Sequence, residues 1–114
     1  MPYISTRTNV KITEETEKLL KAELGKAIEL IPGKTENWLM LDFEDNCRLY
    51  FKGSNEQKLA YIEVKLFGSA SASAYDNLTA EITRIINSHL GISPDCVYVK
   101  YEEVSTWGWN GNNF

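Results

Sequence analysis

The sequence has few of the residues that define several large classes of protein. Its two cysteines, Cys47 and Cys96, are too few and too far apart for a disulfide scaffold or a metal site. No stretch approaches the ~18 apolar residues of a membrane helix, so membrane insertion is not expected. Basic residues are outnumbered, with a net charge of −4 and a pI of about 5.0, which argues against nucleic acid as a partner.

The sequence also lacks signs of subdivision or export. There is no Pro/Ser-rich linker and no block of like charge, and 114 residues suit one domain, so we expect a single domain over residues 1–114. The first residues lack the basic head and apolar stretch of a signal peptide, which favours a cytoplasmic location. Apolar residues make up 43% of the chain, enough for a modest core.

The first half of the chain has the pattern of a strand, a helix and a second strand. Residues 3–10 are rich in β-branched residues and predict a strand. Thr13 is a suitable helix cap, and Pro32-Gly33 ends the helix. A second strand is expected over residues 38–43 and a short one over residues 48–51. The helix is indicated by apolar residues at helical spacing: Leu20, Leu24, Ala27, Ile28 and Ile31.

The same pattern returns in the second half. Residues 60–67 alternate apolar and polar side chains and predict a strand. Gly91 ends the following helix, and residues 96–101 form the matching strand. The repeat is marked by Leu78, Ile82, Ile85 and Ile86, which follow the first helix's apolar set by about 58 residues.

Two such repeats predict an α/β fold of two βαβ units. Right-handed crossovers place both helices on one face of a four-stranded sheet. The opposite face is then uncovered, and we expect apolar strand residues there that still have to be buried. Self-association with closed symmetry is the expected solution.

Pro2 is a candidate catalytic group. Removal of Met1 before a small residue would leave a secondary amine at the start of a strand. Burial beside cations lowers the pKa of such an amine, and a neutral amine near pH 7 is a usable general base. Two alternatives stay open: Pro2 simply permits removal of Met1, or Met1 is retained and the Pro2 nitrogen is an amide without a basic lone pair.

The C-terminal segment carries three aromatic residues in its last eight positions: Trp107, Trp109 and Phe114. A disordered tail seldom holds so many. The segment is therefore expected to dock, either for stability alone or as the aromatic wall of a pocket.

Taken together, these features resemble the macrophage migration inhibitory factor family of the tautomerase superfamily. The resemblance runs over essentially the whole chain, and its specificity lies in the order and spacing of motifs with an N-terminal proline. The motifs are Pro2 after Met1, Thr8-Asn9-Val10, Gly33-Lys34, Phe67-Gly68, Ile92-Ser93-Pro94-Asp95 with Val97-Tyr98, and Trp109-Asn110 with Phe114. It implies a homotrimer of subunits that each contain two βαβ units.

The resemblance implies a cofactor-independent keto–enol tautomerase of phenylpyruvate-like aryl α-keto acids, with no metal. Pro2 then moves the proton, and Lys34 holds the substrate carboxylate and stabilises the enolate. Phe67 stands where the family has an aliphatic residue whose backbone N–H meets the carboxylate. Without the resemblance, Lys34 is an ordinary solvated lysine and Phe67 an ordinary strand residue.

The remaining implied substrate contacts are aromatic, with one exception. Tyr98, Trp109 and Phe114 match pocket aromatics, Trp38 stands where many members have tyrosine, and Tyr3 lines the entrance. Lys100 replaces an asparagine of animal members. It either accepts an acidic substrate tail or extends into water. In the family, Tyr98 and Lys100 come from the neighbouring subunit.

The resemblance leaves a second function open. Family members act as cytokines in animals, so the chain is alternatively a signalling protein that binds a host receptor, with incidental or no tautomerase activity. The family also includes proteins exported without a signal peptide. No Cys-x-x-Cys pair is present, which removes support for thiol oxidoreductase chemistry.

Overall fold

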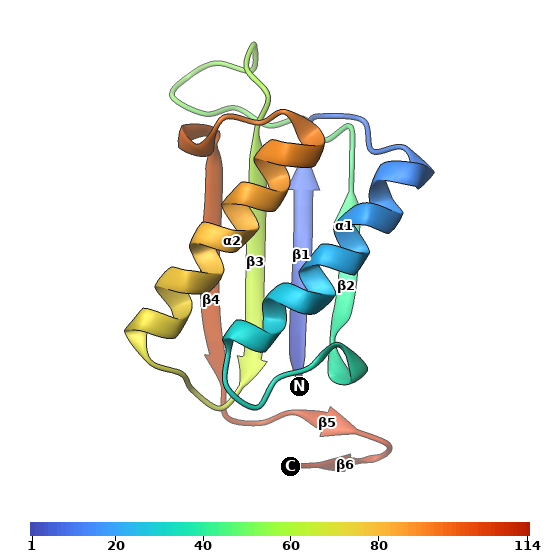
Figure 1. Cartoon of the computed structure of the whole chain (residues 1–114), viewed down its shortest axis with the longest axis vertical. Helices are drawn as coiled ribbons and strands as arrows, with labels where there is room; N and C mark the ends of the chain where they lie inside the picture. The colour runs from blue at the N-terminus through green and yellow to red at the C-terminus, as the bar shows by residue number, and fades with distance from the viewer.

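The computed structural model describes all of residues 1–114 and consists of one four-stranded sheet with two helices across one face (Figure 1). This confirms the predicted α/β fold. The strands are ordered β2-β1-β3-β4 across the sheet. Their bounds, with those of the helices, are β1 (Pro2–Thr8), α1 (Glu14–Ala27), β2 (Met40–Glu44), β3 (Ala60–Phe67), α2 (Ala72–Leu90) and β4 (Val97–Val104).

The strand directions follow from two βαβ units placed side by side. β1 pairs with β2 and β3 pairs with β4 in parallel, whereas the two central strands, β1 and β3, are antiparallel. The two units therefore run in opposite directions. As a result, the connection from α1 to β2 lies at the end of the sheet where β1 begins, and the connection from α2 to β4 lies at the opposite end of the strands (Figure 1). We call these two ends of the sheet its edges, the second being the far edge.

Local sequence accounts for the helix ends. The hydroxyl of Thr13 accepts a hydrogen bond from the backbone N–H of Thr16 (3.2 Å), and Ser71 caps α2 in the same way. α2 stops at Gly91, which adopts the left-handed conformation with φ of 66°. α1 instead tightens into a 3₁₀ turn, η1 (Ile28–Leu30).

The core lies between the helices and the sheet. All the apolar residues that mark the repeat are buried, including Leu24 and its counterpart Ile82, which are both fully buried. Inward positions of the strands supply the other side, among them Ile4, Ile62 and Val64. The periodicity in the sequence therefore identified the core-facing residues correctly.

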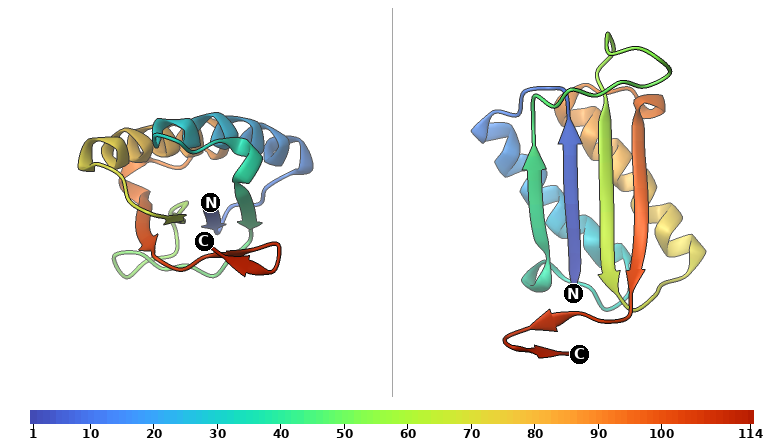
Figure 2. Two further views of the ribbon diagram at one scale, coloured as in Figure 1. Left: turned by 90° about the horizontal axis from the view of Figure 1, so that it is seen from below. Right: turned by 180° about the vertical axis from the view of Figure 1, so that it is seen from behind.

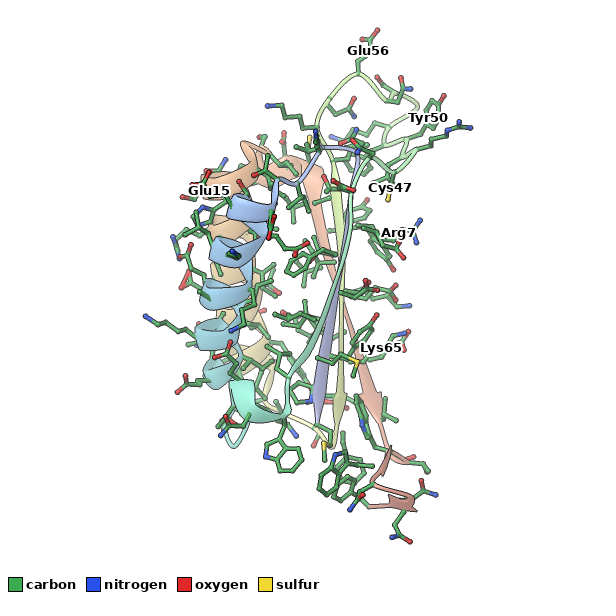
Figure 3. The ribbon with its side chains drawn as sticks, turned by 90° about the vertical axis from the view of Figure 1, so that its right-hand side faces the viewer. Arg7, Glu15, Cys47, Tyr50, Glu56 and Lys65 are labelled. Carbon is green, nitrogen blue, oxygen red and sulfur yellow. The ribbon has the colours of Figure 1, made fainter.

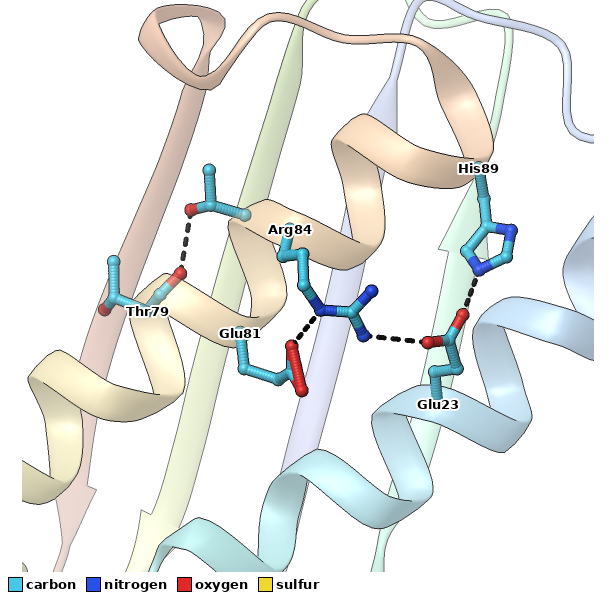
Figure 4. Close-up of polar contacts among 6 residues, drawn as sticks. Glu23, Thr79, Glu81, Arg84 and His89 are labelled. Atoms are coloured by element: carbon cyan, nitrogen blue, oxygen red, sulfur yellow. Dashed lines mark hydrogen bonds and ion pairs between the residues drawn. The ribbon is translucent and has the colours of Figure 1, made fainter.

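The outer surfaces of the two helices are joined by a cluster of charged side chains (Figure 4). Glu23 of α1 accepts a hydrogen bond from Arg84 of α2 (2.8 Å) and pairs with His89 near the end of α2, while Arg84 also pairs with Glu81. Arg84 and His89 hold the pKa of the Glu23 carboxyl below its ordinary value. The only histidine in the chain therefore links the two helices.

Some predicted elements are placed differently. β1 ends at Thr8 rather than residue 10, and β2 begins at Met40, because residues 36–38 form a 3₁₀ turn, η2 (Glu36–Trp38). The expected short strand over residues 48–51 is wrong. That segment belongs to a loop from residue 45 to residue 59, which contains only an isolated bridge between Phe51 and Ser54.

The expectation of apolar residues on the uncovered face of the sheet is confirmed only in part: Met40 and Tyr98 are exposed there, but charged side chains share the face. Arg7 and Lys65 project from it, away from the helices (Figure 3). Arg7 pairs with Glu44 across the strands (2.6 Å), and the Lys65 ammonium lies 6.0 Å from the centre of the Tyr3 ring. These groups satisfy one another across neighbouring strands and suit contact with water.

Beyond β4 the chain turns back beneath the sheet. A short 3₁₀ turn, η3 (Pro94–Cys96), precedes β4, and a hairpin of β5 (Gly108–Trp109) and β6 (Asn112–Asn113) follows it. The hairpin crosses under the edge where β1 begins (Figure 2). No helix is long and apolar enough to cross a membrane.

Candidate functional site

Four segments distant in sequence meet at the edge of the sheet where β1 begins. They are the first residues of β1, the α1–β2 connection, the end of β3 and the C-terminal hairpin (Figures 1 and 2). We call this edge the Pro2 edge. It brings together seven of the nine sequence-predicted site residues in a single chain: Pro2, Tyr3, Lys34, Trp38, Phe67, Trp109 and Phe114.

Backbone groups and Lys34 organise the floor of this site. The Phe67 N–H donates to the Met1 carbonyl oxygen (3.0 Å), and the Lys34 ammonium donates to the Phe67 carbonyl oxygen (2.8 Å). Gly33 precedes Lys34 with φ of 83°, a conformation that glycine adopts without strain. The turn after α1 therefore directs the lysine toward the end of β3.

The surroundings at the Pro2 edge lower the pKa of the amino group that lies there. Burial and, secondly, the neighbouring Lys34 ammonium lower the pKa of the Met1 amino group below its ordinary value. Pro2 itself is buried. With Met1 present, the Pro2 nitrogen is an amide, so basic chemistry at this atom requires that Met1 be removed.

Aromatic rings form the outer part of the site. Trp38 meets Trp109 edge to face at a centroid distance of 5.0 Å, and Phe114 stacks on Trp109 at 6.4 Å. Phe114 also contacts Phe67 at 5.7 Å. Trp38, Trp109 and Phe114 are each about half exposed, so their faces remain available to a ligand.

A cleft runs along this aromatic cluster. Besides Pro2, Tyr3, Trp38 and Trp109, its lining includes Trp107, which the sequence named only as part of the aromatic tail, and Asn37 and Met40, which sequence reasoning did not assign to the site. Asn37 and Met40 flank Trp38 in the chain, and Trp107 precedes Trp109 by two positions. Proximity to recognised residues was thus the only signal that could have found them.

Tyr3 lies next to Pro2, but its side chain is hydrogen-bonded within the sheet. Its hydroxyl donates to Asp42 (2.9 Å). Burial and this hydrogen bond raise the pKa of the phenol above its ordinary value. Tyr3 is therefore a neutral wall of the cleft entrance at neutral pH.

The other two predicted site residues, Tyr98 and Lys100, lie elsewhere in the chain. Tyr98 is in register with Tyr61, which pairs with Arg7, about 17 Å along the sheet from Pro2 at ~3.4 Å per residue. Lys100 donates to Glu102 (2.8 Å), and this bond raises the pKa of the ammonium. One subunit therefore does not bring these two residues to its own Pro2 edge.

Tyr98 instead belongs to an apolar region at the far edge. It meets Phe51 edge to face at 5.0 Å and is 59% exposed. A cavity of about 200 Å³ there is lined only by apolar or aromatic residues and Cys96: Leu49, Tyr50, Phe51, Leu59, Ala60, Tyr61, Cys96 and Tyr98. The far edge thus exposes apolar surface without the polar groups of the Pro2 edge.

Neither edge has the composition of a metal site. No three side chains among the His, Cys, Asp and Glu residues lie close enough together to hold a metal ion. Both cysteines are free, and burial raises the pKa of the Cys96 thiol. The groups present at the Pro2 edge are an amine, the Lys34 ammonium, the Phe67 N–H bonded to the Met1 carbonyl, and aromatic surfaces.

Two βαβ units, Pro2 close to Lys34 and an aromatic C-terminal tail are the features by which the sequence resembles the macrophage migration inhibitory factor family. The chain matches the family model "Macrophage migration inhibitory factor (MIF)" over residues 1–114 and belongs to that family. It is 26% identical over 116 residues to macrophage migration inhibitory factor of Mus musculus, covering 100% of this chain and 99% of the relative.

Solved structures give the same result. MIF2 of Leishmania major superposes with a TM-score of 0.92 at 31% identity, over 100% of this chain and 97% of the other. A macrophage migration inhibitory factor homologue of Prochlorococcus marinus gives 0.88 at 30% identity, with 98% of each chain covered. These relatives support a tautomerase- or MIF-type function in general terms.

Proposed function

We propose that the protein is a cofactor-independent keto–enol tautomerase of phenylpyruvate-like aryl α-keto acids. The observation that carries this proposal is that Pro2, the Lys34 ammonium and the Phe67 N–H lie close together at the Pro2 edge, where Pro2 also lines the aromatic cleft. The three groups offer a base, a cation and a hydrogen-bond donor, which are the groups that a proton transfer next to a carboxylate requires.

The proposed reaction needs only one proton carrier. In the enol-to-keto direction a proton leaves the enol oxygen and another arrives at the β-carbon, with the nitrogen of Pro2, freed by loss of Met1, as the carrier. The lowered pKa of the Met1 amine supports this role, because the same burial and the same Lys34 charge act at this edge. A neutral Pro2 amine accepts a proton near pH 7.

Binding is assigned to the groups around the base. Lys34 and the Phe67 N–H hold the carboxylate once Met1 no longer occupies that N–H. The ring of the substrate lies against Trp38, Trp109 and Phe114, whose exposed faces suit aromatic contacts. Tyr3 lines the entrance.

The proposal includes a homotrimer in which each site is completed by a neighbour. Tyr98 lies at the far edge, next to exposed apolar surface, and Lys100 lies midway along the strands, while the aromatic cleft lies at the Pro2 edge. Head-to-tail contact between unlike edges closes into a ring and brings Tyr98 and Lys100 of one subunit to the cleft of the next. Lys100 then determines which substrate tails are accepted.

The first test is ketonisation of enol-phenylpyruvate, followed by ultraviolet absorbance, on protein whose intact mass shows that Met1 is absent. We expect turnover well above buffer, and Pro2→Gly, which keeps an N-terminal amine, should lose most of it. Rates close to wild type in Pro2→Gly would remove Pro2 as the base. No turnover from correctly processed trimer would remove aryl α-keto acids as substrates.

A signalling function is the second candidate, and the match to the mouse relative favours it, because that relative is named for an effect on macrophage migration. On this hypothesis the trimer binds a host receptor and the cleft is a docking surface. Titration of a receptor ectodomain with wild type and Pro2→Gly separates the two functions. Binding without turnover supports signalling, and turnover without binding supports the enzyme.

A further inference from the structure

The loop that carries Lys34 and Trp38 is attached to helix α1 through Glu36. The side chain of Glu36 pairs with Lys21 of α1 at 3.2 Å. It also lies directly over Gly25, a buried glycine inside the same helix. A Cβ built on Gly25 would overlap the end of the Glu36 side chain, at 2.5 Å from its Cδ, so any other residue would push this flexible carboxylate out of its place.

Glycine is a costly choice at that position. It is one of the least favourable residues in a helix interior, because it loses the most backbone freedom on folding. Gly25 has ordinary helical backbone angles, so no unusual turn requires it. The feature that its missing side chain accommodates is Glu36.

Three alternate residues of this loop thus contact three different elements. Lys34 reaches the Phe67 carbonyl of β3 (2.8 Å), Glu36 reaches α1, and Trp38 packs on Trp109 of the hairpin (5.0 Å). Glu36 is not among the residues that line the cleft, yet in the chain it lies between Lys34 and Trp38. Fixing Glu36 on the helix fixes the positions of both neighbours.

We propose that Glu36, seated over Gly25 and paired with Lys21, is a positioning residue that holds Lys34 and Trp38 in place at the cleft. The functional part of this proposal rests on the proposed tautomerase activity. Glu36 touches neither the substrate nor the reacting atoms. Its effect is on binding, because the residues that it holds are those assigned to the carboxylate and the aromatic ring.

The test is a double-mutant cycle between Gly25 and Glu36, measured by thermal unfolding and by kinetics with enol-phenylpyruvate. Gly25→Ala alone should lower Tm and raise KM, because the added Cβ displaces Glu36. Glu36→Ala alone should raise KM about tenfold with a smaller change in kcat, a size expected from a small displacement of binding groups. In the Glu36→Ala background, Gly25→Ala should instead raise Tm, because the space over the helix is then empty and alanine is the better helix residue.

Two variants serve as controls. Glu29→Ala removes the same charge from the adjoining 3₁₀ turn, at an exposed residue that has no ion pair, and should leave KM unchanged. Glu36→Gln keeps the shape of the side chain over Gly25 but removes the negative charge opposite Lys21. A KM between those of wild type and Glu36→Ala would show that both the packing and the charge of Glu36 contribute. Equal effects of Gly25→Ala in both backgrounds would overturn the proposal.

Amide hydrogen exchange gives a readout that does not depend on turnover. Glu36→Ala should speed exchange in the peptide covering residues 31–39, where the N–H groups of Lys34 and Leu39 are hydrogen-bonded to Ile31 and Glu36. The loop from residue 45 to residue 59 should be unaffected. Unchanged exchange in residues 31–39 overturns the positioning role, whereas absent wild-type turnover with faster exchange rejects only the proposed function.

Discussion

The connections that follow the two helices show how a repeated fold serves a single site. After α1 the chain passes through residues 28–39, which contain two 3₁₀ turns, Gly33 and the site residues Lys34 and Trp38. After α2 it passes through residues 91–96, a short segment with Gly91 and one 3₁₀ turn. The units share core residues at equivalent positions, but their second connections lie at opposite edges of the sheet.

This difference shows that the repeated sequence pattern specifies the strands, helices and core, whereas the residues of the candidate site come from only one of the two connections. Antiparallel pairing of β1 with β3 places the α1–β2 connection beside Pro2 and the α2–β4 connection beside Tyr98. Each edge therefore acquires its own composition. One has an amine, a lysine and tryptophans, and the other has an apolar cavity.

The largest expected effect concerns what the two units share. Leu24→Ala and Ile82→Ala remove equivalent, fully buried side chains, and each should lower the free energy of unfolding by about 2–5 kcal/mol. Both side chains belong to one core, so urea unfolding followed by circular dichroism should stay a single transition in each variant. Two separate transitions in either variant would show that the units unfold independently.

Replacing one lysine at each edge tests whether substrate binding depends on the Pro2 edge alone. Lys34→Ala should raise KM for enol-phenylpyruvate by about tenfold or more, equivalent to ~1.4 kcal/mol, because the carboxylate loses its cation. The methyl ester of the same substrate should be affected much less. Lys58→Ala removes an exposed lysine at the far edge and should leave both values unchanged. Equal losses for acid and ester after Lys34→Ala would exclude carboxylate binding by this residue.

Glycines in left-handed conformations follow both helices and sharpen the comparison further. Gly33→Ala and Gly91→Ala should each cost about 1–2 kcal/mol, because an L side chain is strained at φ of 83° or 66°. Gly33→Ala should also raise KM, since the turn directs Lys34, whereas Gly91→Ala should not. Thermal unfolding and steady-state kinetics on the two proteins check both statements. A similar KM in the two variants contradicts the assignment of the site to one connection.

The smallest effect concerns the contact between the units. Arg84 and His89 lower the pKa of Glu23 in the folded protein, so the stabilisation is present above the unfolded value of about 4.3 and is lost as pH falls through the folded pKa. Glu23→Gln should therefore be less stable than wild type at pH 7, with the difference shrinking below about pH 4. Glu56→Gln, at an exposed loop glutamate without an ion pair, is the control and should show no such convergence. A constant Glu23→Gln difference from pH 7 to pH 3 argues against the carboxylate as its source.

Much of the fold was predictable because local patterns specify it. Thr13, Gly91 and the apolar spacing of both helices act within a few residues, and the structure confirms each of them. The errors arose where tertiary contacts prevail. Residues 48–51 contain β-forming side chains, but they have no neighbouring strand with which to pair, and Trp38 leaves β2 because it packs on Trp109.

The composition of the open face illustrates the same limit. Strand periodicity says which residues share a face, but the prediction of apolar residues on this face did not include the cross-strand ion pairs. Arg7 with Glu44 and Lys100 with Glu63 make part of the face polar and compatible with water. These pairs depend on register, which a single strand does not contain.

The sequence by itself determined the two βαβ units, the helix ends, the core-facing residues and the family, because propensities, caps and periodic burial act locally. Only the tertiary structure decided that Lys34, Phe67 and the tail meet at Pro2, that Tyr98 lies at the far edge with Lys100 midway along the sheet, and that Glu36 is seated over Gly25. The physical reason is that strand order, register and close packing are set by contacts between residues far apart in the chain, and these contacts form only when the whole sheet and its helices are assembled.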